Sequence, residues 1–322
     1  MATGFVAIGQ VNSQWQLVAA FVTMGLGWSC LSTIAVSATI APWFEKFQGK
    51  AISTAMLGAS LGGMLGVPIT LFLVQSLGFT AAMTAIGAIT VCTIVPISLL
   101  ILRRRPQDLG LWPDGLAPEA REVPINEREW TRAQALKTFA LRSTIITFGL
   151  ALMVQLGFLS QQVKLLQTEL SPTATGLTVL ASGSLAFLGR VVLARVADEV
   201  NIRLTAALVL WLAAAGLLVA AMANTATWLV VGVLLFGFNV GNLTTLPALI
   251  VRREFGALSF GKVFGITGTF MQLINACGPA LFGLLHDSTG GYTTPVTVAA
   301  AVMFGGSLII AHGQWPWSKR NH

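Results

Sequence analysis

The stretch GRVVLARVADEVNIR occupies residues 189–203, between two long apolar runs that carry no other charge. Its charged residues are three arginines and two acids, namely Arg190, Arg195, Asp198, Glu199 and Arg203. A charge at membrane depth is costly, so an arginine kept beside an apolar run marks a candidate functional site. The stretch therefore predicts a polar connection between two membrane spans and a candidate functional site.

Composition predicts the fold class. The chain has 322 residues, of which 55% are hydrophobic and only 10% are charged, whereas a soluble domain carries roughly 25% charged residues. Apolar runs of about 20 residues recur, each long enough to cross a roughly 30 Å hydrocarbon core. They are too continuous for barrel strands, and a backbone in lipid must satisfy its own hydrogen bonds. We expect an all-α polytopic membrane protein.

Nine membrane spans are expected, and residues 1–9 are apolar but too short to form another. The spans are 15–41, 51–74, 80–102, 140–162, 173–194, 203–222, 226–250, 263–285 and 293–314. The connection 103–139 is rich in charge and proline, which is typical of a solvated linker, with a short surface helix near 131–138 capped by Thr131.

Basic residues predict the orientation. With the 103–139 loop in the cytoplasm, 18 of the 19 lysines and arginines fall on the cytoplasmic side, and only Lys164 falls outside. The C-terminus is then cytoplasmic too, in a plasma or bacterial inner membrane. The net charge of +7 is explained by these short loops, so it does not indicate nucleic acid.

An internal repeat predicts two related halves. Phe47–Phe79 resembles Ser259–Tyr292, because each opens with Gly-Lys before a glycine-rich helix, at an offset of about 211 residues. When the same offset is applied to the other spans, the second half has six spans, whereas the first half has three spans and the short apolar stub at residues 1–9. We expect a 6+6 plan that lacks its first two to three helices, with a truncated bundle at 1–102, the linker at 103–139 and a six-helix bundle at 140–322.

The chain resembles the major facilitator superfamily, in the branch of the oxalate/formate exchangers and monocarboxylate transporters. WFEKFQGKAISTAMLGASLGGMLGVP (43–68) is similar to that branch's loop and fifth helix, and RRRPQDLGLWPDG (103–115) to its sixth-helix exit. ARVADEVNIR (194–203) resembles the second copy of the superfamily's signature loop, although Glu199, Asn201 and Ile202 depart from the usual pattern. The resemblance implies a major facilitator fold of two pseudo-symmetric six-helix bundles.

Five residues are candidates for binding the substrate. Arg190 lies eight residues before Asp198, and the resemblance associates an arginine at this spacing with a substrate carboxylate, which a guanidinium fork suits. The alternative is that Arg190 extends to the cytoplasmic interface and only sets topology. The other candidates are amides inside spans: Gln155, Asn239, Gln272 and Asn275. Buried amides also serve as contacts between helices, which is the alternative for them.

Further residues are candidates for gating and packing. The family motif implies that Asp198, with Arg195 or Arg203, closes the cytoplasmic side, and Gly49 and Lys50 belong to the matching loop of the first half. The alternative is an ordinary surface ion pair. Gly58, Gly62 and Gly66 precede Pro68 at intervals of four, which predicts a smooth helix face, either the antiporter-type motif of the family or plain packing.

These patterns predict a secondary active transporter of small organic anions rather than an enzyme. The three histidines are scattered, no phosphate-binding loop is present, and no cofactor or metal is expected. The expected partners are the lipid bilayer and a small organic anion, with a proton or counter-anion as the candidate coupled ion and no nucleic acid. The alternatives are an inactive truncated fragment, or a carrier for another small solute or for drug efflux.

Overall fold

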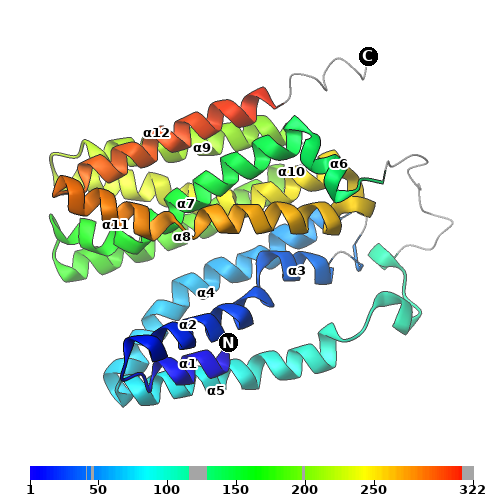
Figure 1. Ribbon diagram of the computed structural model, residues 1–322, viewed down its shortest axis with the longest axis horizontal. Helices are drawn as coiled ribbons and strands as arrows, with labels where there is room; N and C mark the ends of the chain where they lie inside the picture. The colour runs from blue at the N-terminus through cyan, green and yellow to red at the C-terminus, as the bar shows by residue number, and fades with distance from the viewer. Residues whose placement is uncertain (41, 45–46, 116–128, 198–199, 314–322) are drawn as a thin grey trace. The chain divides into compact units, whose positions relative to one another are not determined.

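A computed structural model describes residues 1–40, 42–44, 47–115, 129–197 and 200–313 (Figure 1). Every regular element in these ranges is a helix, which confirms the predicted all-α class. Seven segments in the described residues are long and apolar enough to cross a membrane. The chain forms two compact units, Met1–Pro124 and Ile125–His322, and their boundary falls inside the predicted linker.

The described part of the N-terminal unit contains five α-helices and three short turns of other helix types. They are α1 (Ala2–Ile8), α2 (Gln14–Ser29), α3 (Thr33–Ile40), α4 (Gln48–Leu77), α5 (Phe79–Ile97), a π-turn at Ser98–Leu102, and 3₁₀ turns at Pro106–Leu109 and Pro113–Gly115. The apolar stub at residues 1–9 forms α1, which packs against α2 and α5. Thr80 of α5 donates a hydrogen bond of 2.7 Å to the Gly9 carbonyl, fixing the end of this short helix.

One predicted span in this unit is wrong as a single helix. Residues 15–41 form α2 and α3, separated by a break after Ser29. The Ser29 hydroxyl and the Cys30 thiol both donate to the Leu26 carbonyl, and Ser32 accepts from the backbone N–H of Ala35 at 3.5 Å. Short polar side chains of this kind compete with the helix for its backbone groups, so they end one helix and begin the next.

In the described part of the C-terminal unit the long helices lie side by side, and the short α6 precedes them (Figure 1). They are α6 (Arg132–Lys137), α7 (Phe139–Gln167), α8 (Pro172–Val196), α9 (Ile202–Ala221), α10 (Ala226–Asn275), α11 (Gly278–Thr289) and α12 (Thr293–His312). The expected surface helix is confirmed as α6, because Thr131 caps it in a reciprocal pair with Gln134.

Helix α10 contains two spans joined at a break. Gly256 has φ 75° and ψ 170°, a conformation that only glycine adopts readily, so the chain ends one span there and starts the next. The spans are Ala226–Gly256 and Leu258–Thr289, the second of which runs on through α11. The boundary predicted from hydropathy, between 250 and 263, therefore falls at this glycine.

Glycine allows α8 and α10 to touch through their backbones. A β-carbon on Gly189 would overlap the Phe238 carbonyl oxygen, and one on Gly241 would lie 2.5 Å from the Ala186 carbonyl oxygen. Small residues at such crossings permit the close approach that stabilises helix pairs in membranes. The same crossing carries Arg190, so close packing here also positions the candidate site.

We expect Gly189→Ala to destabilise the C-terminal unit by about 1–3 kcal/mol, because the added methyl group overpacks the crossing. Gly183→Ala on the same helix is the matched control, because a β-carbon there meets no described atom within 4 Å. The measurement is thermal unfolding in detergent, followed by circular dichroism. Equal unfolding temperatures for the two variants would contradict a backbone contact at Gly189.

Candidate functional site

Arg190 is buried where α8 crosses α10. Its side chain is 8% exposed, Nε donates to the Gly241 carbonyl at 2.9 Å, and Nη2 donates to the Thr244 hydroxyl at 2.7 Å. Both of these acceptors lie on α10 and orient the guanidinium. The geometry therefore directs the Arg190 guanidinium onto α10 inside the unit.

Two buried asparagines on α10, Asn239 and Asn242, lie close in sequence to Gly241, whose carbonyl accepts from Arg190. Asn239 is fully buried and donates to the Leu235 carbonyl at 2.8 Å, while its Oδ1 accepts no hydrogen bond from the described residues. Asn242 is 3% exposed, and its Nδ2 lies 3.3 Å from the place that a β-carbon of Gly189 would take. A buried amide group left without a partner costs free energy, so these positions favour a polar occupant.

The remaining predicted amides lie near a second helix crossing, where α7 meets the start of α11. A β-carbon on Gly278 would overlap the Met153 carbonyl oxygen, so the two backbones touch. Asn275 donates to Gln272 at 2.9 Å, which brings two of the predicted residues together. The Oδ1 of Asn275 and the Oε1 of Gln155 accept no hydrogen bond from the described residues.

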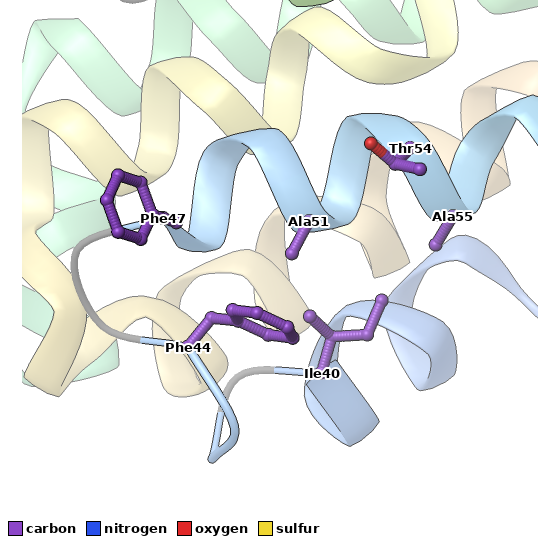
Figure 2. Close-up of a pocket in the computed structure, with 6 residues that line it drawn as sticks. All are labelled: Ile40, Phe44, Phe47, Ala51, Thr54 and Ala55. Atoms are coloured by element: carbon purple, nitrogen blue, oxygen red, sulfur yellow. The ribbon is translucent and has the colours of Figure 1, made fainter. Parts of the chain in front are cut away.

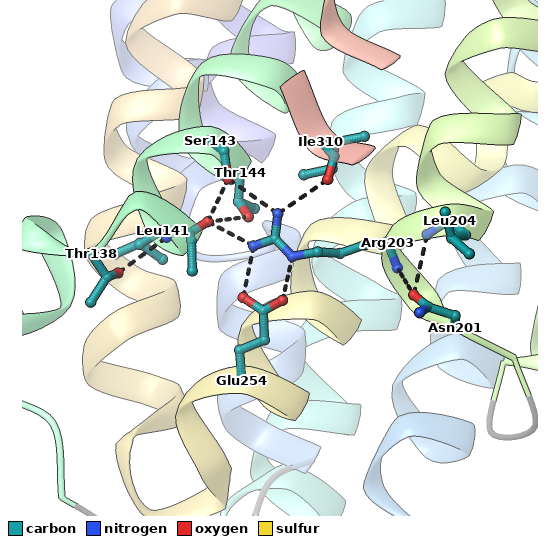
Figure 3. A network of polar contacts seen from close by, with 10 residues as sticks. Thr138, Leu141, Ser143, Thr144, Asn201, Arg203, Leu204, Glu254 and Ile310 are labelled. Atoms are coloured by element: carbon teal, nitrogen blue, oxygen red, sulfur yellow. Dashed lines mark hydrogen bonds and ion pairs between the residues drawn. The ribbon is translucent and has the colours of Figure 1, made fainter. Parts of the chain in front are cut away.

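Arg203 forms the most extensive polar network in the described part of the unit (Figure 3). It is 2% exposed, and Nε and Nη2 donate to both carboxylate oxygens of Glu254, the second at 2.8 Å. The remaining donors reach the Ser143 hydroxyl at 3.1 Å and the carbonyls of Ile310 and Ala140. One guanidinium thus links α7, α9, α10 and α12 at a single point.

Arg253, next to this network, holds the connection between α8 and α9. Its Nη1 donates to the Val200 carbonyl at 2.8 Å, and its Nη2 donates to the Ala197 carbonyl. The last carbonyls of a helix lack partners within the helix, and a cation there also suits the helix dipole. The connection that resembles the family's signature loop is therefore fastened to α10.

The structure describes some of the predicted gating residues but not all of them. Arg203 pairs with Glu254, whereas Arg195 is exposed on the last turn of α8 and Asp198 lies outside the described residues. Gly49 and Lys50 belong to the first turn of α4. The pairing of Asp198 with either arginine stays a prediction.

The predicted glycine face of α4 is open in the described N-terminal unit. A β-carbon on Gly58, Gly62 or Gly66 would meet nothing within 4 Å there, and Pro68 continues the same helix. The packing partner expected for this face stays a prediction.

The N-terminal unit contains an apolar cavity of about 430 Å³ between α3 and the first turns of α4 (Figure 2). Ile40 and Phe44 form one side of it, and Phe47, Ala51, Thr54 and Ala55, at the start of α4, form the other. Among its described lining residues only Thr54 has a polar side chain, so these residues offer no charge that would bind an organic anion. It is therefore a poorer anion site than the surroundings of Arg190.

The end of the linker docks beside the Gly256 break. The Trp130 N–H donates to the buried Ser259 hydroxyl at 2.7 Å, and its ring meets the Phe255 ring edge-on at 5.3 Å. Glu129 accepts from Lys262 at 2.6 Å, and this hydrogen bond and the lysine's charge hold the pKa of Glu129 below its ordinary value. These contacts attach the start of the C-terminal unit to the hinge between two spans.

Sequence reasoning missed Glu254 and the role of Arg253. Both follow span 226–250 in the run VRREF, and their contacts lie more than 50 positions away in sequence. The sequence nevertheless held a clue to these partners, because an arginine that is buried requires a carboxylate or several carbonyls as hydrogen-bond acceptors. Of the acidic residues near a span end, Glu254 was the candidate partner that this requirement could have indicated.

Comparisons with known proteins agree with the fold. The family model described as Major Facilitator Superfamily matches residues 1–273. Monocarboxylate transporter 11 of Mus musculus is 27% identical over 304 residues, covering 88% of this chain and 63% of the mouse protein. The aspyridones efflux protein apdF of Emericella nidulans is 26% identical over 296 residues, covering 86% of this chain and 54% of that protein.

A solved structure is also similar. The crystal structure of the human organic anion transporter MFSD10 gives a TM-score of 0.68 at 17% identity, covering 96% of this chain and 74% of that one. At 17% sequence identity, this similarity supports a shared fold alone. The chain spans less than two thirds of the length of the curated relatives it matches.

We expect Glu254→Gln to cost about 3–5 kcal/mol of stability, because it leaves the Arg203 charge buried without its counter-charge. The matched control is Glu129→Gln, which breaks an ion pair whose side chains are 55% and 66% exposed and well solvated. Thermal unfolding in the same detergent measures both. If Glu254→Gln lowers the unfolding temperature no more than Glu129→Gln, the network does not hold the four helices.

Proposed function

Because the chain belongs to the Major Facilitator Superfamily, we propose that it acts as a secondary transporter of small organic anions in a membrane. Transport would proceed by alternating access, in which two helical bundles rock around a site near the middle of the bilayer. The step involves binding and release and no covalent chemistry. Relatives that match most of this chain are named monocarboxylate transporters, which supports a monocarboxylate-like substrate.

The buried guanidinium of Arg190 is the observation that carries the choice of an anion. A positive charge inside a membrane protein is costly and is kept where a function needs it. The Gly241 carbonyl and the Thr244 hydroxyl accept from it and orient its planar donor group at the α8–α10 crossing. A planar guanidinium suits the two oxygens of a carboxylate better than an ammonium does.

Amide side chains complete the proposed site. Asn239 on α10, Gln155 on α7, and the Gln272–Asn275 pair each have a polar atom inside the unit. An amide can donate or accept, so these groups can bind the substrate's other polar atoms or ordered water. A proton or a counter-anion is the candidate coupled ion.

The polar networks at one end of the unit suit the rocking of a rigid bundle. Arg203 ties four helices together, and Arg253 fastens the α8–α9 connection to α10. In this proposal Asp198, with Arg195 or Arg203, and Gly49 and Lys50 in the other half, contribute contacts that break when the cytoplasmic side opens. The distribution of lysine and arginine places this end, the 103–139 loop and the C-terminus in the cytoplasm.

The second candidate is a carrier for a different small solute, including efflux. The relative named as an aspyridones efflux protein supports it. A second observation is that the span Leu258–Thr289 contains a single lysine or arginine, the exposed Lys262, which is paired with Glu129. A dicarboxylate would favour a second buried cation, so the structure suits a singly charged or a larger, mostly apolar substrate.

We expect Arg190→Lys to lower uptake of small carboxylates by about tenfold or more, because an ammonium cannot form the paired hydrogen bonds of a guanidinium. The measurement is uptake of labelled formate, lactate and oxalate into liposomes that contain the purified protein. Arg132→Lys is the matched control, since Arg132 is exposed on the surface helix α6.

Three outcomes of this assay have different meanings. Saturable uptake by the wild type that Arg190→Lys lowers and Arg132→Lys spares supports the proposal. If Arg190→Lys leaves uptake unchanged, Arg190 does not bind the substrate and only sets the topology of the chain in the membrane. Wild-type uptake no greater than in empty liposomes would reject anion transport by this chain.

A further inference from the structure

A second cavity, with a polar lining, lies at the end of the C-terminal unit opposite the Arg203 network. Its volume is about 360 Å³, and it forms where α7, α9 and α11 end and where α10 and α12 begin. Arg203 lies in the first turn of α9, whereas Ala220 and Ala221 in the last turn of that helix line the cavity. A helix of 20 residues is about 30 Å long, so the cavity is remote from the network.

Charge around this cavity favours a cation. The carboxylate of Glu169 lines it, just past the end of α7, and Asp287 is adjacent to the lining residue His286. Three helices end here, at Gln167, Ala221 and Thr289, and their last carbonyls carry partial negative charge. The starts of α10 and α12 offset part of that effect. Lys164, in the last turn of α7, adds one positive charge at this end, and the carboxylates of Glu169 and Asp287 outnumber it.

The cavity also has an aromatic wall. Tyr292, the only tyrosine of the chain, packs against His286 with ring centroids 4.4 Å apart. The His286 Nδ1 lies 3.2 Å from the Asp287 carboxylate, which orients the imidazole. Burial and the charge of Asp287 raise the pKa of Tyr292, so its phenol stays neutral at physiological pH. A neutral phenol ring presents a π-face that attracts cations.

The chemistry of these groups favours an organic cation over a metal ion. Among the described residues, no group of three or more histidine, cysteine, aspartate or glutamate side chains could hold a metal. An aromatic face beside a carboxylate is instead the arrangement that recognises ammonium groups. The small side chains of Gly290 and Ala221 leave room for the substituents of such an ion.

We propose that this cavity is a binding site for a small organic ammonium ion, with Tyr292 contacting the cation through its ring and Glu169 supplying the counter-charge. The site is separate from the anion site around Arg190, and it stands whether or not this chain transports anions. It lies at the end of the unit that the positive-inside rule assigns to the outer side of the membrane.

The test uses the full chain in lipid nanodiscs with tetraethylammonium chloride as the probe. Saturation-transfer NMR follows the probe's methyl signal at constant ionic strength. We expect saturable binding, with Tyr292→Leu and Glu169→Gln each weakening it by about fivefold or more, and Tyr292→Phe retaining it because the ring remains. Glu129→Gln is the matched control, because Glu129 is an exposed carboxylate paired with Lys262, far along the chain from the cavity.

Several results would overturn the proposal. These are the absence of saturable binding to the wild type, or equal affinity in the wild type, Tyr292→Leu and Glu169→Gln. Displacement of the probe by millimolar magnesium chloride would overturn the assignment to an organic cation. If Tyr292→Leu fails to fold, as judged by circular dichroism and gel filtration, the exposed Glu169→Gln decides the question alone.

Discussion

The Arg203 guanidinium is buried at the point where four helices of the C-terminal unit meet, and a charge in such surroundings is stable only when it is fully paired. All five of its N–H groups donate, two of them to Glu254 and three to Ser143, Ala140 and Ile310. Each acceptor lies on a helix that must keep its place for the charge to stay satisfied. The packing of α7, α9, α10 and α12 at this end therefore depends on one side chain.

The two buried arginines of the unit differ in the partners that hold them. Arg203 has the negative charge of Glu254, so its own charge is neutralised and its role is to join helices. Arg190 is oriented by the Gly241 carbonyl and the Thr244 hydroxyl at the crossing of two helices. The first arrangement suits structure, and the second suits recognition of an anion. Glycines at the α8–α10 crossing make the second arrangement possible, because they bring the Gly241 carbonyl within reach of the guanidinium.

The ends of the unit also differ in charge. One end carries the Arg203–Glu254 pair, Arg253 and the docked linker, whereas the other carries Glu169, Asp287, Lys164 and the aromatic pair of Tyr292 and His286. The polar groups of the interior lie between them, around Arg190 and the Gln272–Asn275 pair. A solute that crosses the unit would thus meet surroundings of different electrostatic character at each stage.

Sequence alone determined the class of this protein and much of its helix plan. Apolar length and backbone chemistry require helices in lipid, and spans such as 203–222 and 293–314 agree with α9 and α12 within two residues. The N-cap at Thr131 was also predictable, because a cap is a local interaction. The break after Ser29 was not predicted from hydropathy, since it arises from hydrogen bonds of a few small polar side chains within an otherwise apolar run.

Only the tertiary structure decided the partners of the charges. Glu254 lies 51 positions from Arg203, and Thr244 lies 54 positions from Arg190. The cavity beside Tyr292 likewise combines five helix ends that the sequence keeps far apart. Hydrophobicity is a property of each residue and can be read along the chain. A buried charge is satisfied by whichever polar groups folding brings within about 3 Å of it, and that depends on how the helices pack.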